Sequence, residues 1–244
     1  MEALRHSLSA WLTSQQVAHF GVADLEKYQQ QYPEAPFTNL PRWKRGVVLV
    51  YPLLAGVLET INDRPTHLYF HHYRQVNYIL DRLSLGVGQI LENRGFKALA
   101  IGASQTLDPE DRLAHLSHRH AALLAGLGWR GKNNLLVTPW YGSRVRLVTV
   151  ITDAPLDADA PLDGRDCGEC SLCVERCPAG AIGDTPEQFD LEACHKKLSE
   201  FRRIPRIGQR ICGVCQGACR PHDGRHTKQQ RSPLDDDRVE TRAG

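Results

Sequence analysis

The chain has 244 residues with 30 Lys and Arg against 28 Asp and Glu, and the resulting net charge of +2 favours no particular polyanion as a partner. Its 41% hydrophobic content is sufficient for a sizeable core in one or two domains. The longest apolar stretch, residues 46–58, contains Pro52 and is too short to span a bilayer, and the first residues have no signal-peptide pattern. We therefore expect a globular protein with no membrane-spanning segment.

Residues 1–153 are predicted to form a mixed α/β domain. Apolar residues at helical spacing predict a helix around residues 4–12, and the β-branched, apolar residues 46–51 suit a buried strand. A long apolar stripe predicts a helix over residues 76–91, and a strand at residues 98–101 follows it.

The rest of this domain contains one more predicted helix and two strands. Ser117 is placed to cap a helix that runs to Ala125. Strand-like runs follow at residues 135–138 and 145–152, and the turn-rich residues 139–143 join them.

Three further segments follow the α/β domain. Residues 154–166 are rich in Pro, Asp and Ala, which indicates a linker. Residues 167–221 hold all 8 cysteines of the chain and are predicted to form a second domain. Residues 222–244 are polar, of mixed charge and without apolar periodicity, so we expect a flexible tail.

The cysteines fall into two runs whose spacing is typical of iron–sulfur ligation. The first run, residues 167–178, has the spacing C-x2-C-x2-C-x3-C-P, which is the bacterial ferredoxin pattern. In that pattern the fourth cysteine binds the neighbouring cluster. The second run, residues 212–219, has three cysteines, and Cys194 between the two runs supplies the missing fourth. The spacing predicts two [4Fe–4S] clusters. The ligands predicted for one are Cys167, Cys170, Cys173 and Cys219, and those for the other are Cys177, Cys194, Cys212 and Cys215.

Zinc is the main alternative, because paired C-x2-C units also form tetrahedral zinc sites. A zinc site needs neither the third C-x2-C step nor the final Cys-Pro. Disulfides are rare in reducing compartments, where short C-x2-C loops are usually redox-active or metal-bound. Iron–sulfur clusters are assembled inside cells and are sensitive to oxygen, so we expect a cytoplasmic protein.

A glycine-rich motif, residues 125–134, lies between the predicted helix that ends at Ala125 and the next strand. Its glycines allow positive φ angles or a close approach to a ligand, its lysine can neutralise an anionic group, and its asparagines both donate and accept hydrogen bonds. The simpler interpretation is a tight turn that places a tryptophan in the core. The order of residues excludes a P-loop.

The motif from Gly126 to Asn133, the strand hairpin that ends at Thr152 and Asp153, and the two cysteine runs together resemble the epoxyqueuosine reductase family, and more distantly the cobalamin-dependent reductive dehalogenases. The resemblance covers roughly residues 40–221. It implies an α+β protein, with a nitroreductase-like α/β N-terminal domain followed by a bacterial-ferredoxin-like module with two [4Fe–4S] clusters. In epoxyqueuosine reductase the substrate is the epoxide of a modified tRNA wobble base.

The resemblance also implies a cofactor, because members of that family bind cobalamin between the two domains and reduce it through the clusters. A flavin is the alternative, since a nitroreductase-like shell could hold one. The cofactor-binding residues predicted on this basis are Gly126, Gly128, Trp129, Gly131, Lys132, Asn133 and Asn134.

Two features of the family have no match here. Its reductases carry an Asp-Ser/Thr-Ala-Pro stretch, whose aspartate is thought to donate a proton, and a C-terminal helical-repeat domain that helps to hold tRNA. At the position of that stretch this sequence has Leu-Ser-His-Arg-His, residues 116–120, and after the cysteine runs it has only the polar tail. We therefore expect a short form of the family, for which tRNA is less strongly indicated as the substrate. Imidazole titrates near neutral pH, so His118 or His120 is the predicted catalytic proton donor. The alternative is that both lie on the solvent face of a helix.

The segment between the two cysteine runs is basic. A basic face can raise the potential of an anionic cluster, dock an acidic electron donor such as flavodoxin or ferredoxin, or contact RNA phosphate. An exposed helix flank is the simplest interpretation. The residues concerned are His195, Lys196, Lys197, Arg202, Arg203, Arg206 and Arg210.

The sequence therefore favours an iron–sulfur oxidoreductase in which two clusters pass electrons to a bound cofactor that reduces a substrate. The alternative is a non-catalytic two-cluster protein that delivers electrons to a corrinoid enzyme or another reductase. The large N-terminal domain favours the enzyme, because a simple carrier needs little beyond its clusters. The missing aspartate and repeat domain favour the carrier.

Overall fold

A four-stranded antiparallel sheet forms the centre of the computed structural model, which describes residues 2–17, 19–33, 43–108 and 114–220. The order of the strands is β1-β2-β6-β3, so the chain crosses the sheet rather than adding strands in sequence. The bounds are β1 His19–Asp24, β2 Arg45–Pro52, β3 Ala98–Ile101 and β6 Val145–Thr152.

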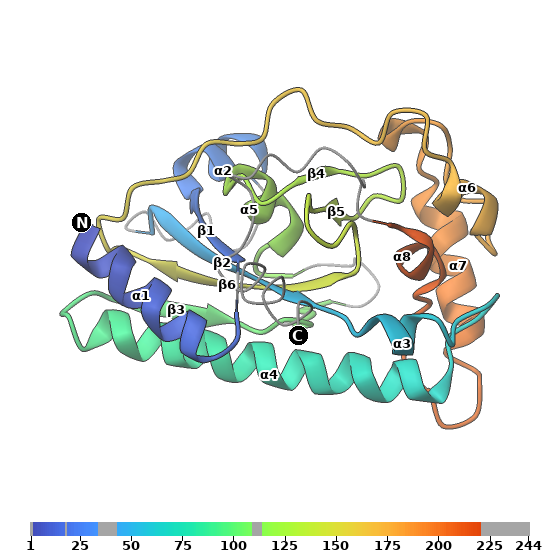
Figure 1. The fold of residues 1–244 in the computed structure, drawn as a ribbon, viewed down its shortest axis with the longest axis horizontal. Coiled ribbons are helices and arrows are strands. Elements are labelled where there is room, and N and C mark those ends of the chain that lie inside the picture. Colours follow the sequence, from blue (N-terminus) through green and yellow to red (C-terminus); the bar gives the residue numbers. More distant parts are fainter. Residues whose placement is uncertain (1, 18, 34–42, 109–113, 221–244) are drawn as a thin grey trace, which may run out of the picture.

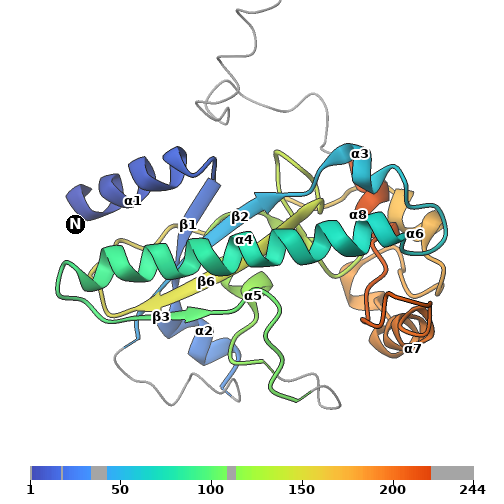
Figure 2. The ribbon, with the colours of Figure 1, turned by 90° about the horizontal axis from the view of Figure 1, so that it is seen from below.

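Helices cover both faces of this sheet (Figures 1 and 2). The helices α1 (Glu2–Ser14) and α4 (His67–Glu92) pack on one face, and α2 (Leu25–Gln31) and α5 (His118–Leu124) pack on the other. Side chains of successive strand residues point to opposite faces, so every residue from 47 to 50 in the central strand β2 is buried against one helical layer or the other. This confirms the buried strand predicted for residues 46–51.

The other elements predicted for residues 1–153 are mostly present. The strands at residues 98–101 and 145–152 are β3 and β6, and the helix predicted at residues 76–91 is part of the longer α4. Ser117 caps α5, since its side chain accepts a hydrogen bond from the backbone N–H of His120 at 3.4 Å. The strand predicted at residues 135–138 is reduced to β5 (Leu136–Val137), which pairs with β4 (Trp129–Arg130) in a small second sheet.

The cysteine-rich residues lie at one end of the sheet, beside the start of α4 and the short helix α3 (Ala55–Leu58) (Figures 1 and 2). Their apolar side chains Ile207, Ile211 and Val214 belong to the same hydrophobic cluster as Leu58 and Tyr69. The two parts of the chain therefore share one core at this end. The elements are α6 Leu172–Arg176, the 3₁₀ helix η2 Pro186–Gln188, α7 Leu191–Phe201 and α8 Val214–Ala218.

Residues 154–166 contain no helix or strand, but they are fixed along β1. Asp159 exchanges hydrogen bonds with the backbone of Val22, at 2.8 Å in each direction, and forms an ion pair with Arg5 at 2.9 Å. Arg45 donates to the carbonyl of Leu156 at 2.7 Å. A linker held in this way fixes where the cysteine-rich segment begins.

A mixed α/β architecture is confirmed. The nitroreductase-like and ferredoxin-like character of the two parts, and the domain limits at residues 153 and 166, stay predictions. The predicted flexible tail, residues 222–244, lies outside the described residues. Among the helices that the structure describes, none combines the length and the apolar character needed to cross a membrane.

Candidate metal centre and cofactor pocket

The eight cysteine thiols come together in two groups, and none of them forms a disulfide. Burial and then the neighbouring charges of Cys219, Cys167 and Cys170 raise the pKa of Cys173 to about 11, which places these four side chains together. We call Cys167, Cys170, Cys173 and Cys219 the first thiol group.

The second thiol group consists of Cys177, Cys194, Cys212 and Cys215. Burial, together with the charges of Cys194 and Cys177, raises the pKa of Cys212 to about 11. Burial also raises the pKa of Cys215 well above its ordinary value. The charge of Cys212 adds to this rise, followed by that of Cys173 in the first group. The two groups have the compositions predicted from the spacing, and they lie next to each other. Metal ligation by these residues stays a prediction.

Backbone N–H groups point at one sulfur of each group. The amide of Ser143 donates to Sγ of Cys219 at 3.2 Å, and that of Ala181 donates to Sγ of Cys177 at 3.4 Å. Such hydrogen bonds stabilise a thiolate that carries negative charge. A thiol must lose its proton to bind a metal, so binding of a cluster to these groups would release protons.

The spacing of the thiols suits a cluster better than a single ion. Over the described residues, no three His, Cys, Asp or Glu side chains converge on a point that one metal ion could occupy. In a cubane each thiolate binds a different iron atom, so the four sulfurs stand further apart than around one ion. The donor set of two groups of four thiols therefore fits two [4Fe–4S] clusters.

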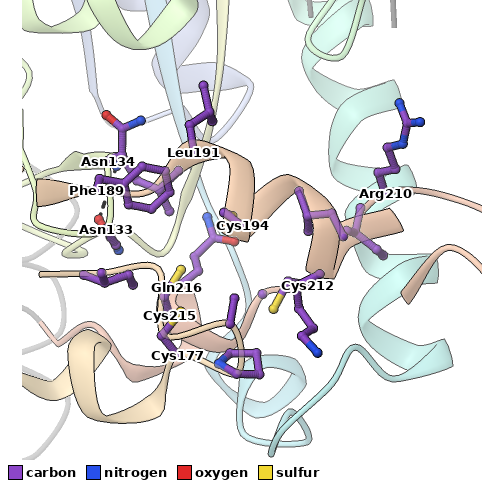
Figure 3. Close-up of a pocket in the computed structure, with 18 of the residues that line it drawn as sticks. Asn133, Asn134, Cys177, Phe189, Leu191, Cys194, Arg210, Cys212, Cys215 and Gln216 are labelled. Carbon is purple, nitrogen blue, oxygen red and sulfur yellow. Dashed lines mark hydrogen bonds between the residues drawn. The ribbon is translucent and has the colours of Figure 1, made fainter. Parts of the chain in front are cut away.

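The second thiol group lines a pocket of about 320 Å³ between the cysteine-rich helices and the α/β sandwich (Figure 3). All four cysteines of the group border it, and residues of the sandwich form the facing wall. The cluster predicted for this group would occupy the part of this space between the four thiols, and a group bound toward the facing wall would lie within contact distance of it. The residues of the facing wall are Tyr69, Tyr73, Asn133, Asn134, Leu135 and Arg146.

The glycine-rich motif is a tightly packed connection in which two glycines are required by geometry. Gly126 ends α5 with φ +66°, and the N–H of Leu127 bonds to the carbonyl of Ala122 at 3.1 Å, which is a Schellman motif. At Gly128 a side chain would come within 2.2 Å of the carbonyl of Val137. Trp129 is buried, as the tight-turn interpretation expects, and Gly131 packs against Val137. Binding of a cofactor by these residues stays a prediction.

The three polar residues of the motif take different positions. Lys132 is buried, and its Nζ donates to the carbonyl of Cys170 at 3.1 Å. Asn133 is buried and donates to Ser143 Oγ at 3.0 Å. Asn134 has φ +57°, and its side-chain oxygen accepts a hydrogen bond from Arg130 at 3.1 Å. Lys132 thus contacts the first thiol group, whereas the two asparagines line the pocket beside the second.

The two histidines predicted to donate a proton are both partly buried, and their rings contact other parts of the protein. The ring of His118 bonds to Thr149 Oγ1 at 2.9 Å and to the carbonyl of Gly102 at 3.1 Å, and burial lowers its pKa to about 4. His120 stacks on Tyr32 with ring centres 4.0 Å apart, and burial and then Arg119 lower its pKa to about 4. Both rings are neutral at pH 7 in this environment. The catalytic role of each stays a prediction.

Sequence reasoning missed four residues of the facing wall, Tyr69, Tyr73, Leu135 and Arg146, of which Tyr73 and Arg146 interact with each other. The guanidinium of Arg146 lies 4.2 Å from the ring centre of Tyr73, whose hydroxyl bonds to Ser104 at 3.0 Å. Burial alone would raise the pKa of Tyr73, but Arg146 and the hydrogen bonds of Ser104 and Asn77 bring it below its ordinary value. A signal was present, since Arg146 is a charged residue in an otherwise apolar strand.

The fold and the site define an α/β/α sandwich joined to a cysteine-rich helical segment, with a pocket between them. This is the fold of solved structures of epoxyqueuosine reductase and of reductive dehalogenases. The structure of epoxyqueuosine reductase from Bacillus subtilis matches with a TM-score of 0.57 and 23% identity, over 95% of this chain and 68% of that one. A structure of epoxyqueuosine reductase with an epoxyqueuosine-modified tRNA-Tyr stem loop matches with a TM-score of 0.57 and 23% identity, over 93% of this chain and 67% of that one. A reductive dehalogenase described as B12-dependent matches with a TM-score of 0.60 and 20% identity, over 72% of this chain and 25% of that one.

Curated homologues of the chain are named epoxyqueuosine reductase. The chain is 37% identical to that of Bacillus subtilis over 120 residues, which are 45% of this chain and 30% of the relative. It is 49% identical to that of Listeria monocytogenes over 120 residues, which are 44% of this chain and 31% of the relative. The chain thus matches less than a third of the length of these relatives. No protein-family profile matches the chain.

Proposed function

We propose that the chain is an iron–sulfur reductase related to the epoxyqueuosine reductases, with two [4Fe–4S] clusters that pass electrons to an acceptor in the pocket. The observation that carries the proposal is the arrangement of eight thiols in two adjacent groups of four, the second of which lines the pocket. The homologues named epoxyqueuosine reductase support it.

Each part of the chain has a distinct task in this proposal. The two thiol groups hold the clusters, and a cubane supplies one-electron transfer when it is bound. The backbone amides of Ser143 and Ala181 stabilise the charge on the sulfurs. Tyr73, with its pKa lowered beside Arg146, is a phenol in the pocket wall that can release a proton.

Cobalamin is the proposed acceptor, with a flavin as the alternative. The pocket volume of about 320 Å³ is at the lower end for small-molecule pockets, and the cluster held by the second thiol group would itself occupy part of it. The pocket does not enclose a whole corrinoid, so binding of cobalamin would require the ring to extend past its rim. A corrinoid or flavin held there would supply the bond chemistry, and the protein would position it.

The decisive experiment is anaerobic reconstitution followed by titration with cobalamin. The proposal requires about eight irons per chain and a shift of the cobalamin visible spectrum on binding. Titration with FMN under the same conditions tests the alternative acceptor. Two clusters with binding of neither cofactor would leave a two-cluster electron-transfer protein and would refute the reductase. Fewer than four irons per chain would refute the cluster assignment itself.

The substrate and the electron donor are parts of the same proposal. Epoxyqueuosine in tRNA is the proposed substrate because the named homologues are epoxyqueuosine reductases. A flavodoxin or ferredoxin is the proposed donor, and the exposed basic side chains Lys196, Arg202, Arg203 and Arg206 beside the second thiol group would attract its acidic surface. Conversion of an epoxyqueuosine-modified tRNA stem loop by the reconstituted protein, with reduced flavodoxin supplied, tests both.

A further inference from the structure

Two buried cations of the α/β sandwich meet the first thiol group. Lys132 and Arg144 are each 8% exposed. Lys132 Nζ lies 3.1 Å from the carbonyl oxygen of Cys170, and an Nη of Arg144 lies 2.7 Å from that of Gly217, two residues before Cys219. Within the described part of the chain, the Nε of Arg144 is also buried and has no hydrogen-bond acceptor. Both positive charges therefore stand beside ligands of one predicted cluster.

No carboxylate among the described residues forms an ion pair with either cation. Glu59 is the acid near enough to influence Arg144, and Arg220 adds a further positive charge on the same side. The amide of Ser143 donates to Sγ of Cys219 from the same loop. The acids next to its ligands in the chain, Asp166 and Glu169, are exposed and screened by water, whereas Lys132 and Arg144 are buried and act more strongly on this group.

The second thiol group has different surroundings. Lys197, its nearest cation from α7, is partly exposed and pairs with Glu200 at 2.5 Å. Arg146 and Arg210 border the same pocket and are also partly exposed. Asp190 lies close enough to Cys194 to contribute, after burial, to raising its pKa. Charges here are paired or in contact with water, so their effect on a cluster is weaker.

We propose that the cluster of the first thiol group has the higher reduction potential of the two, because Lys132 and Arg144 stabilise its reduced state. This inference rests on the two clusters of the proposed function. One electron from the donor reduces one cubane, and no bond is made or broken in that step. A nearby buried positive charge favours the extra electron. The cluster of the first thiol group is thus reduced first. The cluster of the second thiol group, beside the pocket, is the stronger reductant of the acceptor.

The test is a potentiometric titration of the reconstituted full chain, followed by electron paramagnetic resonance. The wild type is expected to show two reduction steps. Lys132→Gln removes the charge and keeps a donor near the carbonyl of Cys170. We expect this variant to lower the higher of the two reduction potentials by at least about 59 mV, which is a tenfold change in the one-electron equilibrium. The lower of the two potentials should not change. Cys170→Ser, at a predicted ligand of the first cluster, is expected to alter the spectrum that develops in the upper step.

Three variants serve as controls. Lys132→Arg keeps the charge and should keep the upper potential. Lys196→Gln removes an exposed charge close to Cys194 and should move neither step. Arg144→Gln should lower the upper step as Lys132→Gln does, and it replaces that variant if Lys132→Gln does not load its clusters.

The outcomes separate this inference from the proposed function. About eight irons per chain with an unchanged upper step in Lys132→Gln, or a spectrum of the upper step unaffected by Cys170→Ser, would overturn the inference and leave the clusters standing. An equal shift of both reduction potentials in Lys132→Gln would also overturn the inference. Absence of cubane signals in the wild type would instead refute the proposed function.

Discussion

The sandwich and the cysteine-rich segment are held together by different means. The sheet and its helices bury long apolar stripes, and Leu80, Leu83 and Leu91 of α4 have no more than 1% of their surface exposed. In the cysteine-rich segment α7 has no buried residue, and the only buried residue of α6 is Cys173. Hydrophobic burial is the main source of stability in the first region, whereas under the proposed function the second would depend on contacts with the sandwich and on its metal centre.

Loss of a predicted ligand should have the largest effect and should be confined to the second region. In Cys194→Ala the second cluster loses one of four ligands, so we expect iron to fall from about eight to about four or fewer per chain. Ser199→Ala, on the same helix α7, is the matched control and should keep the full iron content. Iron analysis and the absorbance of the clusters measure the result. Retention of eight irons in Cys194→Ala would contradict the ligand set.

A cavity in the sandwich should destabilise the other region. Leu80 has 0% of its surface exposed, and Leu80→Ala should lower the free energy of unfolding by about 2–5 kcal/mol. Leu85 on the same helix is 61% exposed, so Leu85→Ala should cost well under about 1 kcal/mol. Thermal unfolding followed by circular dichroism compares the two. Equal losses would mean that α4 does not pack as described.

Removal of a hydrogen-bonding residue between the two regions should affect both. Gln216 of α8 donates to the carbonyls of Ser143 and Val145 at 2.8 and 2.9 Å and accepts from the hydroxyl of Tyr69 at 3.0 Å. Gln216→Leu leaves those buried groups without partners, at a cost of about 1–3 kcal/mol. We expect a lower Tm together with faster loss of iron. The exposed Gln75 of α4 provides the control variant Gln75→Leu, which should change neither.

The smallest expected effect is a pH dependence that belongs to the sandwich. The pKa values of His118 and His120 are about 4 in the folded protein, against 6.5 for an ordinary histidine. Between these pH values the unfolded chain binds protons that the folded chain does not, so stability falls as the pH is lowered from about 6.5 to 4. Unfolding by urea at several pH values should show a smaller fall in His118→Gln than in the wild type, and an equal fall would contradict the low pKa.

Local patterns predicted most elements of the sandwich. Residues 98–101 and 145–152 are strands because their β-branched and apolar residues suit a pleated, buried surface, and Ser117 caps α5 as its position indicates. The strand β1 and the helix α2 were missed. The run of residues 19–24 is short and includes Gly21, so only pairing with β2 makes it a strand.

The site was less accessible to sequence reasoning than the elements. The spacing of the cysteines indicated two sets of four ligands, and the structure brings the thiols together in groups of the same composition. The pocket wall was predicted only at Asn133 and Asn134, because Tyr73 of α4 and Arg146 of β6 are brought to it by the fold. The environments of His118 and His120 were equally hidden, since their burial depends on β6 and on Tyr32.

The sequence by itself determined the apolar periods of the sandwich and the spacing of the thiols, because both are local properties that follow from the geometry of helices, strands and short turns. Only the tertiary structure decided that the two thiol groups have different neighbours. Lys132 and Arg144 reach the first group, and the pocket lies beside the second. Electrostatic environment depends on residues far apart in the sequence, and no local pattern records it.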